Sequence, residues 1–249
     1  MIRRYTTPPG RIQSLYRDMS EQTHLLIAGA TESGKSVVIN GIISTLLYRL
    51  PVDIPDGAQF ILIDPKRVEL ARYKGIPHVI QYASEPSEML SALNYAMQIT
   101  ESRYKLMQKQ RKLKYTGGDI YVIIDEFADL MTTQGKTVKP LIQRLAQIGR
   151  AARVHIILAT QTPITKIIPT EIKCNFDSRV GLRTRSAQDS RNILGYAGLE
   201  VLPRYGEGIY MTPEGDDLWE IPMVEEEEID RLVRHWSKQG GILRRLFSA

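Results

Sequence analysis

The residues with the clearest chemical potential form a loop near the start of the chain. Residues 29–36 match the phosphate-binding pattern G-x-x-x-x-G-K-[ST] in full. In such a loop the lysine, Lys35, reaches the β- and γ-phosphates, and the hydroxyl of Ser36 holds Mg²⁺. The alternative is a chance match in a turn rich in Gly and Ser. The residues expected to bind nucleotide are Gly29, Ala30, Thr31, Glu32, Ser33, Gly34, Lys35, Ser36 and Val37.

Two adjacent carboxylates form a second candidate group, because Asp125 and Glu126 directly follow the apolar run 121–124. We expect Asp125 to hold Mg²⁺, directly or through water, and Glu126 to polarise the attacking water. Paired acids after an apolar strand also occur by chance, but downstream of a full phosphate loop they favour an ATPase. Gln161, after the apolar run 155–160, is expected near the γ-phosphate; the alternative is a turn-forming amide.

The elements that must position these residues follow from apolar runs of strand length and apolar stripes of helical period. Strands are predicted at 24–28, 60–63, 121–124 and 155–160. Helices are predicted at 37–50, from residue 84 onward, from about Pro140 after a flexible link through Gly135, and from Glu225 to Gly240-Gly241. This alternation predicts an α/β fold. Lys66 and Arg67 follow the second strand, and a ligand-binding or a solvated role stays open for both.

Length and composition favour one domain with terminal extensions. The 249 residues are 43% hydrophobic, enough for a substantial core. We expect an extended arm at 1–22, with a short helix at 12–19, a core at 23–224, and a C-terminal helix and tail at 225–249. We interpret the tail as a packing element; a docking segment is the weaker alternative.

Charge and cysteine content limit the partners and the compartment. A net charge of +5 fits a polyanionic partner without demonstrating one. The lone Cys174 excludes an internal disulfide framework and fits a reducing cytoplasm. No apolar run reaches the roughly 18 to 20 residues of a membrane span, so a membrane role would come through a partner. The four histidines show no metal-ligand spacing.

Taken in order, these segments resemble the motor domain of the FtsK/SpoIIIE family of double-stranded DNA translocases, within the FtsK–HerA group. The resemblance covers about residues 23–210. It implies a RecA-like P-loop NTPase fold, with a mostly parallel central sheet flanked by helices, that uses ATP and Mg²⁺ in a homohexameric ring on duplex DNA. Besides the phosphate loop it rests on residues 24–29, 63–66, 69–70, 75–78, 103–107, 124–130, 144–147, 150–152, 158–161 and 189–191.

The resemblance also implies roles for basic residues. Arg150 matches the arginine finger, which reaches the ATP of the neighbouring subunit and stabilises the charge of the transition state. Lys173 and Arg191 match pore-facing residues that contact the DNA backbone without reading its sequence. Charge alone would place Lys173 in a solvated loop and Arg191 on a helix surface. Arg183 and Arg185 are candidates to replace a DNA contact missing nearby.

Three positions depart from the family pattern. Thr162 stands in place of an arginine, Ala187 in place of a basic residue, and Glu32 in place of a glycine in the phosphate loop. The sequence also leaves no room for the membrane-anchored part, the complete small domain before the motor, or the winged-helix module. We therefore expect a minimal motor, with a membrane or transfer-apparatus protein as a possible partner. Two alternatives stay open: a motor for protein export, and a nucleotide-dependent switch or scaffold with little turnover.

Overall fold

The computed structural model describes residues 2–5, 12–15, 23–49, 57–203 and 205–247. A ten-stranded sheet with the strand order β2-β1-β10-β9-β8-β3-β7-β6-β4-β5 forms its centre. Strands β8, β3, β7, β6, β4 and β5 run parallel, and the other strands extend the sheet in antiparallel fashion. The strands are β1 Ile2–Tyr5, β2 Ile12–Leu15, β3 His24–Ala28, β4 Gln59–Ile63, β5 Val79–Ala83, β6 Ile120–Ile124, β7 Val154–Thr160, β8 Ser178–Leu182, β9 Glu207–Thr212 and β10 Gly215–Glu220.

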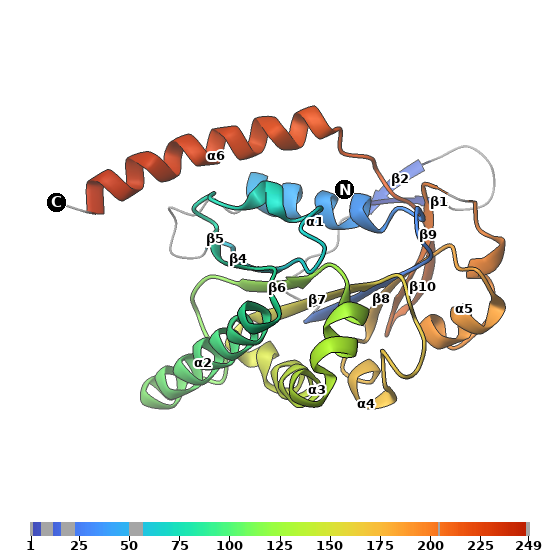
Figure 1. Ribbon diagram of the computed structural model, residues 1–249, viewed down its shortest axis with the longest axis horizontal. Coiled ribbons are helices and arrows are strands. Elements are labelled where there is room, and N and C mark those ends of the chain that lie inside the picture. Colours follow the sequence, from blue (N-terminus) through green and yellow to red (C-terminus); the bar gives the residue numbers. More distant parts are fainter. Residues whose placement is uncertain (1, 6–11, 16–22, 50–56, 204, 248–249) are drawn as a thin grey trace.

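Helices cover both faces of this sheet. Figure 1 shows α1 and α6 on one face and α2, α3 and α4 on the other. Two short 3-10 turns, η1 Ala71–Tyr73 and η2 Leu199–Val201, complete the set. The predicted α/β class with a mostly parallel sheet is therefore confirmed. The helices are α1 Lys35–Arg49, α2 Pro86–Gln110, α3 Phe127–Ala152, α4 Thr170–Lys173, α5 Ala187–Leu194 and α6 Glu226–Phe247.

The parallel strands are continuous apolar runs because they are buried on both faces. In β3, Leu25 and Ile27 join the hydrophobic cluster on the α1 and α6 side, whereas Leu26 joins the cluster on the α2 and α3 side. This is the alternation expected when successive side chains point to opposite faces of a covered sheet. One large hydrophobic cluster packs on each side of the strands, and a third, smaller cluster contains Ala28 at the end of β3.

The predicted helix at 12–19 is wrong where the structure describes it. Residues 12–15 form β2, which pairs with β1 in the register Ile2↔Leu15 to Tyr5↔Ile12. Residues 16–19 lie outside the described part of the chain. The backbone pairing available along β1 outweighs the weak local preference of a four-residue segment. The described parts of the arm, residues 2–5 and 12–15, thus add two strands to the core sheet.

Two further helix boundaries differ from the prediction. The expected flexible link through Gly135 lies inside α3, although Gln134 has non-helical backbone angles (φ −136°, ψ 21°) that mark a kink. The C-terminal helix was expected to end at Gly240-Gly241, but α6 continues to Phe247. Each interior glycine costs a helix only about 1 kcal/mol relative to alanine, so glycine alone does not stop it.

A buried ionic cluster fixes the amino ends of the central strands. The carboxylate of Asp119 accepts from Arg153 at 2.9 and 2.6 Å and lies 2.8 Å from His155 Nε2. Burial opposes ionisation of this carboxyl, but the bonds from His155 and Arg153 outweigh it and lower the pKa of Asp119. Beside the cluster, burial lowers the pKa of His24 to about 3, so this ring is neutral.

Asp119→Asn is expected to lower the free energy of unfolding by about 2 kcal/mol at pH 7. Removing one partner of a fully buried ion pair costs more stability than this. Here the Arg153 side chain is 35% exposed, so water screens its charge and reduces the cost. Because the folded pKa is lowered, the stabilisation is present above the unfolded pKa of about 3.9 and is lost as pH falls below it. Urea unfolding followed by tryptophan fluorescence at pH 7 and 3.5 measures both effects. An Asp119→Asn protein as stable as the exposed control Glu101→Gln would contradict the prediction.

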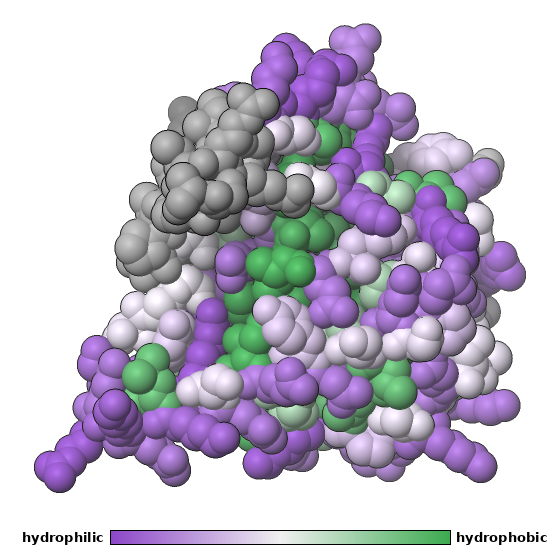
Figure 2. Space-filling model, turned by 60° about the vertical axis from the view of Figure 1, so that its left-hand side comes forward, coloured by the Kyte–Doolittle hydropathy of each residue, from purple (hydrophilic) through white to green (hydrophobic). Residues whose placement is uncertain are grey.

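The edge of the sheet at β5 is open to solvent. Four of the five β5 residues are only partly buried. Figure 2 brings the β5 and α2 side forward and shows a mostly hydrophilic surface crossed by a strip of hydrophobic side chains.

Among the helices within the described ranges, none is both long and apolar enough to cross a membrane.

Candidate nucleotide-binding site

The phosphate loop lies between β3 and α1, as the sequence predicted. Its first residues are tied to both neighbouring strands, since the Gly29 N–H donates to Thr160 O at 3.3 Å and the Ala30 N–H donates to Arg183 O at 2.8 Å. A Cβ on Gly29 would lie 2.6 Å from the Cβ of Leu182, so only glycine fits there. The first N–H groups of α1 have no partner within the helix and lie at the positive end of its dipole. This is a suitable seat for a triphosphate.

Glu32 has a backbone that normally selects glycine. Its φ is 62°, in the left-handed region, and its side chain is exposed. A non-glycine residue in this region costs roughly 1 to 2 kcal/mol. A glycine would adopt this conformation without that cost, whereas the glutamate carboxylate lies exposed at the surface of the loop.

Lys35 and Asp125 form the buried centre of the site. The Lys35 ammonium donates to Asp125 Oδ1 at 2.6 Å and to the Asp125 carbonyl at 2.9 Å, with side chains 5% and 2% exposed. Burial raises the pKa of Asp125, the Lys35 ammonium opposes this, and the nearby carboxylates of Asp64 and Glu69 add to it. Four carboxylates, Asp64, Glu69, Asp125 and Glu126, thus lie around this edge of the sheet with Lys35 and Lys66.

Glu126 is buried at the end of β6 and held through both carboxylate oxygens. Its Oε1 accepts from Thr160 Oγ1 at 2.8 Å and from the Gln161 N–H at 3.1 Å. Its Oε2 accepts from Lys66 Nζ at 3.2 Å and, at 3.4 Å, from the same Gln161 N–H. The side chain of Gln161 meets the phosphate loop, because its Oε1 accepts from Thr31 Oγ1 at 2.9 Å. The structure therefore brings Lys35, Asp125, Glu126 and Gln161 together.

The oxygen donors at this edge fit Mg²⁺. Asp125 and Ser36 supply the predicted ligands, and Asp64 lies next to them with Oδ2 accepting from the Leu70 N–H at 3.0 Å. The other oxygen, Asp64 Oδ1, is buried without a hydrogen-bond partner among the described residues. No group of three or more His, Cys, Asp or Glu in the described part of the chain forms a complete metal cage. Mg²⁺ needs no such cage, because it keeps waters and phosphate oxygens in its shell.

Arg150 lies far from the phosphate loop of its own chain. It is exposed in the last turn of α3, and this helix begins directly after Glu126. Arg150 lies close before the amino end of β7, whereas the phosphate loop follows the carboxyl end of β3, which runs parallel to β7. The two therefore lie at opposite edges of the sheet.

The predicted DNA-contacting residues lie beside β8 and α5. Arg183 and Arg185 follow β8, and Arg191 lies on α5; all three side chains are exposed. Lys173 is partly buried and donates to the Asn192 carbonyl at 2.9 Å, which joins α4 to α5. Burial, and next the charge of Arg179, lower the pKa of Lys173.

Arg179 joins the same elements, and no motif in the sequence marked it as a site residue. Its guanidinium donates to the carbonyls of Phe176, Ile193 and Lys173 at 2.9, 2.9 and 3.2 Å. Thr160 and Asp64 were not among the predicted site residues, and for Lys66 a ligand-binding role was one of two alternatives. The signals for Lys66 and Asp64 were their position directly after an apolar strand and their place in segment 63–66, which resembles the family.

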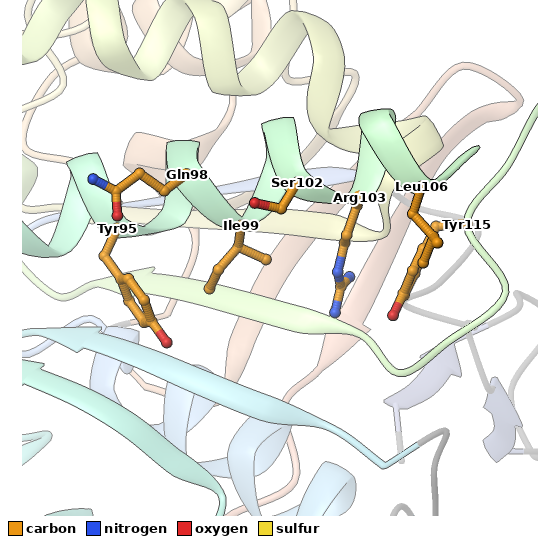
Figure 3. Close-up of a pocket in the computed structure, with 7 residues that line it drawn as sticks. All are labelled: Tyr95, Gln98, Ile99, Ser102, Arg103, Leu106 and Tyr115. Atoms are coloured by element: carbon orange, nitrogen blue, oxygen red, sulfur yellow. The ribbon is translucent and has the colours of Figure 1, made fainter. Parts of the chain in front are cut away.

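A hollow of about 370 Å³ lies on α2, away from this site (Figure 3). Arg103, in its lining, is placed 4.2 Å from the ring centre of Tyr115 and donates to the carbonyls of Ala152 and Arg153 at 2.7 and 3.0 Å. These contacts satisfy the end of α3, so the lining is explained by structure. The lining residues are Tyr95, Gln98, Ile99, Ser102, Arg103, Leu106 and Tyr115.

Solved structures share this fold. The conjugation coupling protein TcpA of pCW3, in a monomer form with ATPγS, superposes with a TM-score of 0.78 and 21% identity, over 94% of this chain and 70% of that one. The cytoplasmic domain of the type VII secretion ATPase EccC of Thermomonospora curvata gives a TM-score of 0.72 and 23% identity, over 86% and 28%.

Sequence relatives are more similar. DNA translocase FtsK of Bradyrhizobium diazoefficiens is 37% identical over 90% of this chain and 32% of its own length. DNA translocase FtsK of Rickettsia bellii is 37% identical over 91% and 36%. The chain thus spans about a third of the length of these relatives. The FtsK/SpoIIIE family model matches residues 9–119 and 109–165, and the chain belongs to the FtsK/SpoIIIE family.

Proposed function

We propose that this chain is an ATP-driven double-stranded DNA translocase that works as a homohexameric ring. The observation that carries the proposal is the convergence of Lys35, Asp125, Glu126 and Gln161 on one phosphate loop. Residues 23–224 are the motor, with 1–22 and 225–249 as extensions. We expect it to work in the cytoplasm, where ATP and DNA are both present.

Each residue of the site has a chemical task in this proposal. The N–H groups of the loop and Lys35 bind the triphosphate, and Ser36 and Asp125 hold Mg²⁺. The metal neutralises phosphate charge when bound. Glu126, fixed by its hydrogen bonds, orients and polarises the attacking water. Gln161, held by Thr31, senses the γ-phosphate.

Duplex DNA is the proposed substrate of the motor. Arg183, Arg185 and Arg191 offer exposed guanidinium groups for phosphates, and Lys173 is proposed to join them by leaving the Asn192 carbonyl. Backbone contacts of this kind grip any sequence and weaken with salt. The backbone of Arg183 accepts a hydrogen bond from the phosphate loop, which provides a short route from nucleotide to DNA.

The alternatives are less well supported. Identity reaches 38% with proteins named as DNA translocases and 23% with a secretion ATPase, which favours DNA over an exported protein. A switch with little turnover was suggested by Glu32 and Thr162. Both side chains are exposed, and the charged residues proposed for hydrolysis are all present.

Duplex DNA is expected to stimulate ATP hydrolysis by at least about tenfold at low salt, with stimulation falling steeply as salt rises. The double variant Arg185→Ala/Arg191→Ala should lose most of the stimulation and keep the basal rate. Lys109→Ala, which removes an exposed cation on α2, is the matched control. ATP turnover assayed with duplex DNA, and separately with secretion-signal peptides, tests this. Turnover that ignores DNA at low salt, or responds only to peptide, would contradict the proposal.

A further inference from the structure

Lys66 touches the proposed water-polarising residue from a side that the phosphate loop does not reach. Its Nζ is 3.2 Å from Glu126 Oε2, and it comes from the loop after β4. Thr160 holds the other oxygen from the end of β7, and the Gln161 N–H is shared between both oxygens at 3.1 and 3.4 Å. Because β6 lies between β4 and β7 in the sheet, the carboxylate is held from both flanking strands.

The loop that carries Lys66 is itself fixed in place. The N–H groups of Arg67 and Leu70 donate to the carbonyl and the carboxylate of Asp64 at 3.2 and 3.0 Å. The guanidinium of Arg67 forms an ion pair with Glu85, at the start of α2. The anchored loop therefore keeps the backbone of Lys66 within reach of Glu126.

We propose that Lys66 is a positioning residue for ATP hydrolysis, which orients the Glu126 carboxylate toward the attacking water. Thr160 contacts one carboxylate oxygen, Lys66 contacts the other, and the Gln161 N–H is shared between both. With both oxygens held, the lone pairs that remain for the attacking water have a fixed direction. The inference rests on the proposed function, because it requires Glu126 to act on water.

If Lys66 had a purely structural role, its loss would lower the free energy of unfolding. Its side chain is 41% exposed, and an ion pair with that much solvent contributes little to folding. Loss of Lys66 should therefore leave unfolding unchanged and act on the rate of hydrolysis. Misplacement of a reacting group by about 1 Å costs on the order of 100-fold in rate.

Lys66→Met is expected to lower kcat by roughly 10- to 100-fold while the Kd for ATP stays within about twofold. Lys66→Arg should restore most of the rate, because it returns a cation of similar reach. Lys109→Met makes the same chemical change at an exposed site and should match the unmodified protein. Stopped-flow nucleotide binding and single-turnover hydrolysis with duplex DNA separate the two quantities.

A double-variant cycle tests whether Lys66 acts through Glu126. In a Glu126→Gln background, Lys66→Met should cause no further loss in single-turnover rate. The inference would be overturned if Lys66→Met lowered the single-turnover rate equally in both backgrounds. It would also be overturned if Lys66→Met left kcat unchanged or lowered ATP affinity in parallel with kcat. Each of these outcomes would leave the proposed function intact. An unmodified protein that hydrolyses no ATP would instead overturn the proposed function, and this inference with it.

Discussion

Glu126→Gln is expected to bind ATP as tightly as the unmodified protein while its kcat falls about 1000-fold. The glutamine amide has the same size, and its oxygen can still accept from Thr160 and Gln161. It cannot take a proton from water at neutral pH, so the general-base contribution is removed. Its NH₂ group would face Lys66, whose partly exposed side chain can move away.

Rapid-quench hydrolysis and equilibrium binding of a fluorescent ATP analogue measure the two quantities separately. Glu101→Gln removes an exposed carboxylate on α2 and should leave both unchanged. Urea unfolding establishes that each variant is folded. A Glu126→Gln protein that keeps more than about a tenth of the turnover would show that another group activates the water.

The central residues of the site could be predicted because their signals are local. Lys35 belongs to a continuous motif, and Asp125 and Glu126 directly follow an apolar strand. The carboxyl ends of parallel strands meet at one edge of a sheet, so two such motifs suffice to bring these groups together. The contacts of Lys35 with Asp125 are the consequence.

The partners that orient Glu126 could not be predicted, because they depend on strand order. Lys66 is 60 residues from Glu126 in sequence and Thr160 is 34 away, and they flank it only because β6 lies between β4 and β7. The antiparallel strands of the sheet could not be predicted either, because they also depend on which strands become neighbours. Strand β10, with the sequence Gly-Asp-Asp-Leu-Trp-Glu, has little intrinsic strand preference and is formed by pairing with β9 and β1.

Arg150→Ala is expected to lower DNA-stimulated turnover by about 1000-fold or more, the usual contribution of an arginine finger. ATP affinity should change little, because the finger stabilises charge that develops in the transition state. Arg150 is exposed at the far end of α3, so its own phosphate loop is out of reach. Arg144→Ala, which removes an exposed arginine on the same helix, is the control.

Mixing two inactive variants tests whether this arginine acts between subunits. Lys35→Ala keeps Arg150 but loses the ammonium that binds phosphates, whereas Arg150→Ala keeps its phosphate loop. Where the two alternate in a ring, an intact phosphate loop faces an intact arginine, and turnover should rise well above that of either protein alone. Fluorescently labelled subunits report that the proteins have mixed. Mixed rings without recovered turnover, or a fully active Arg150→Ala protein, would exclude an arginine finger supplied by a neighbour at this position.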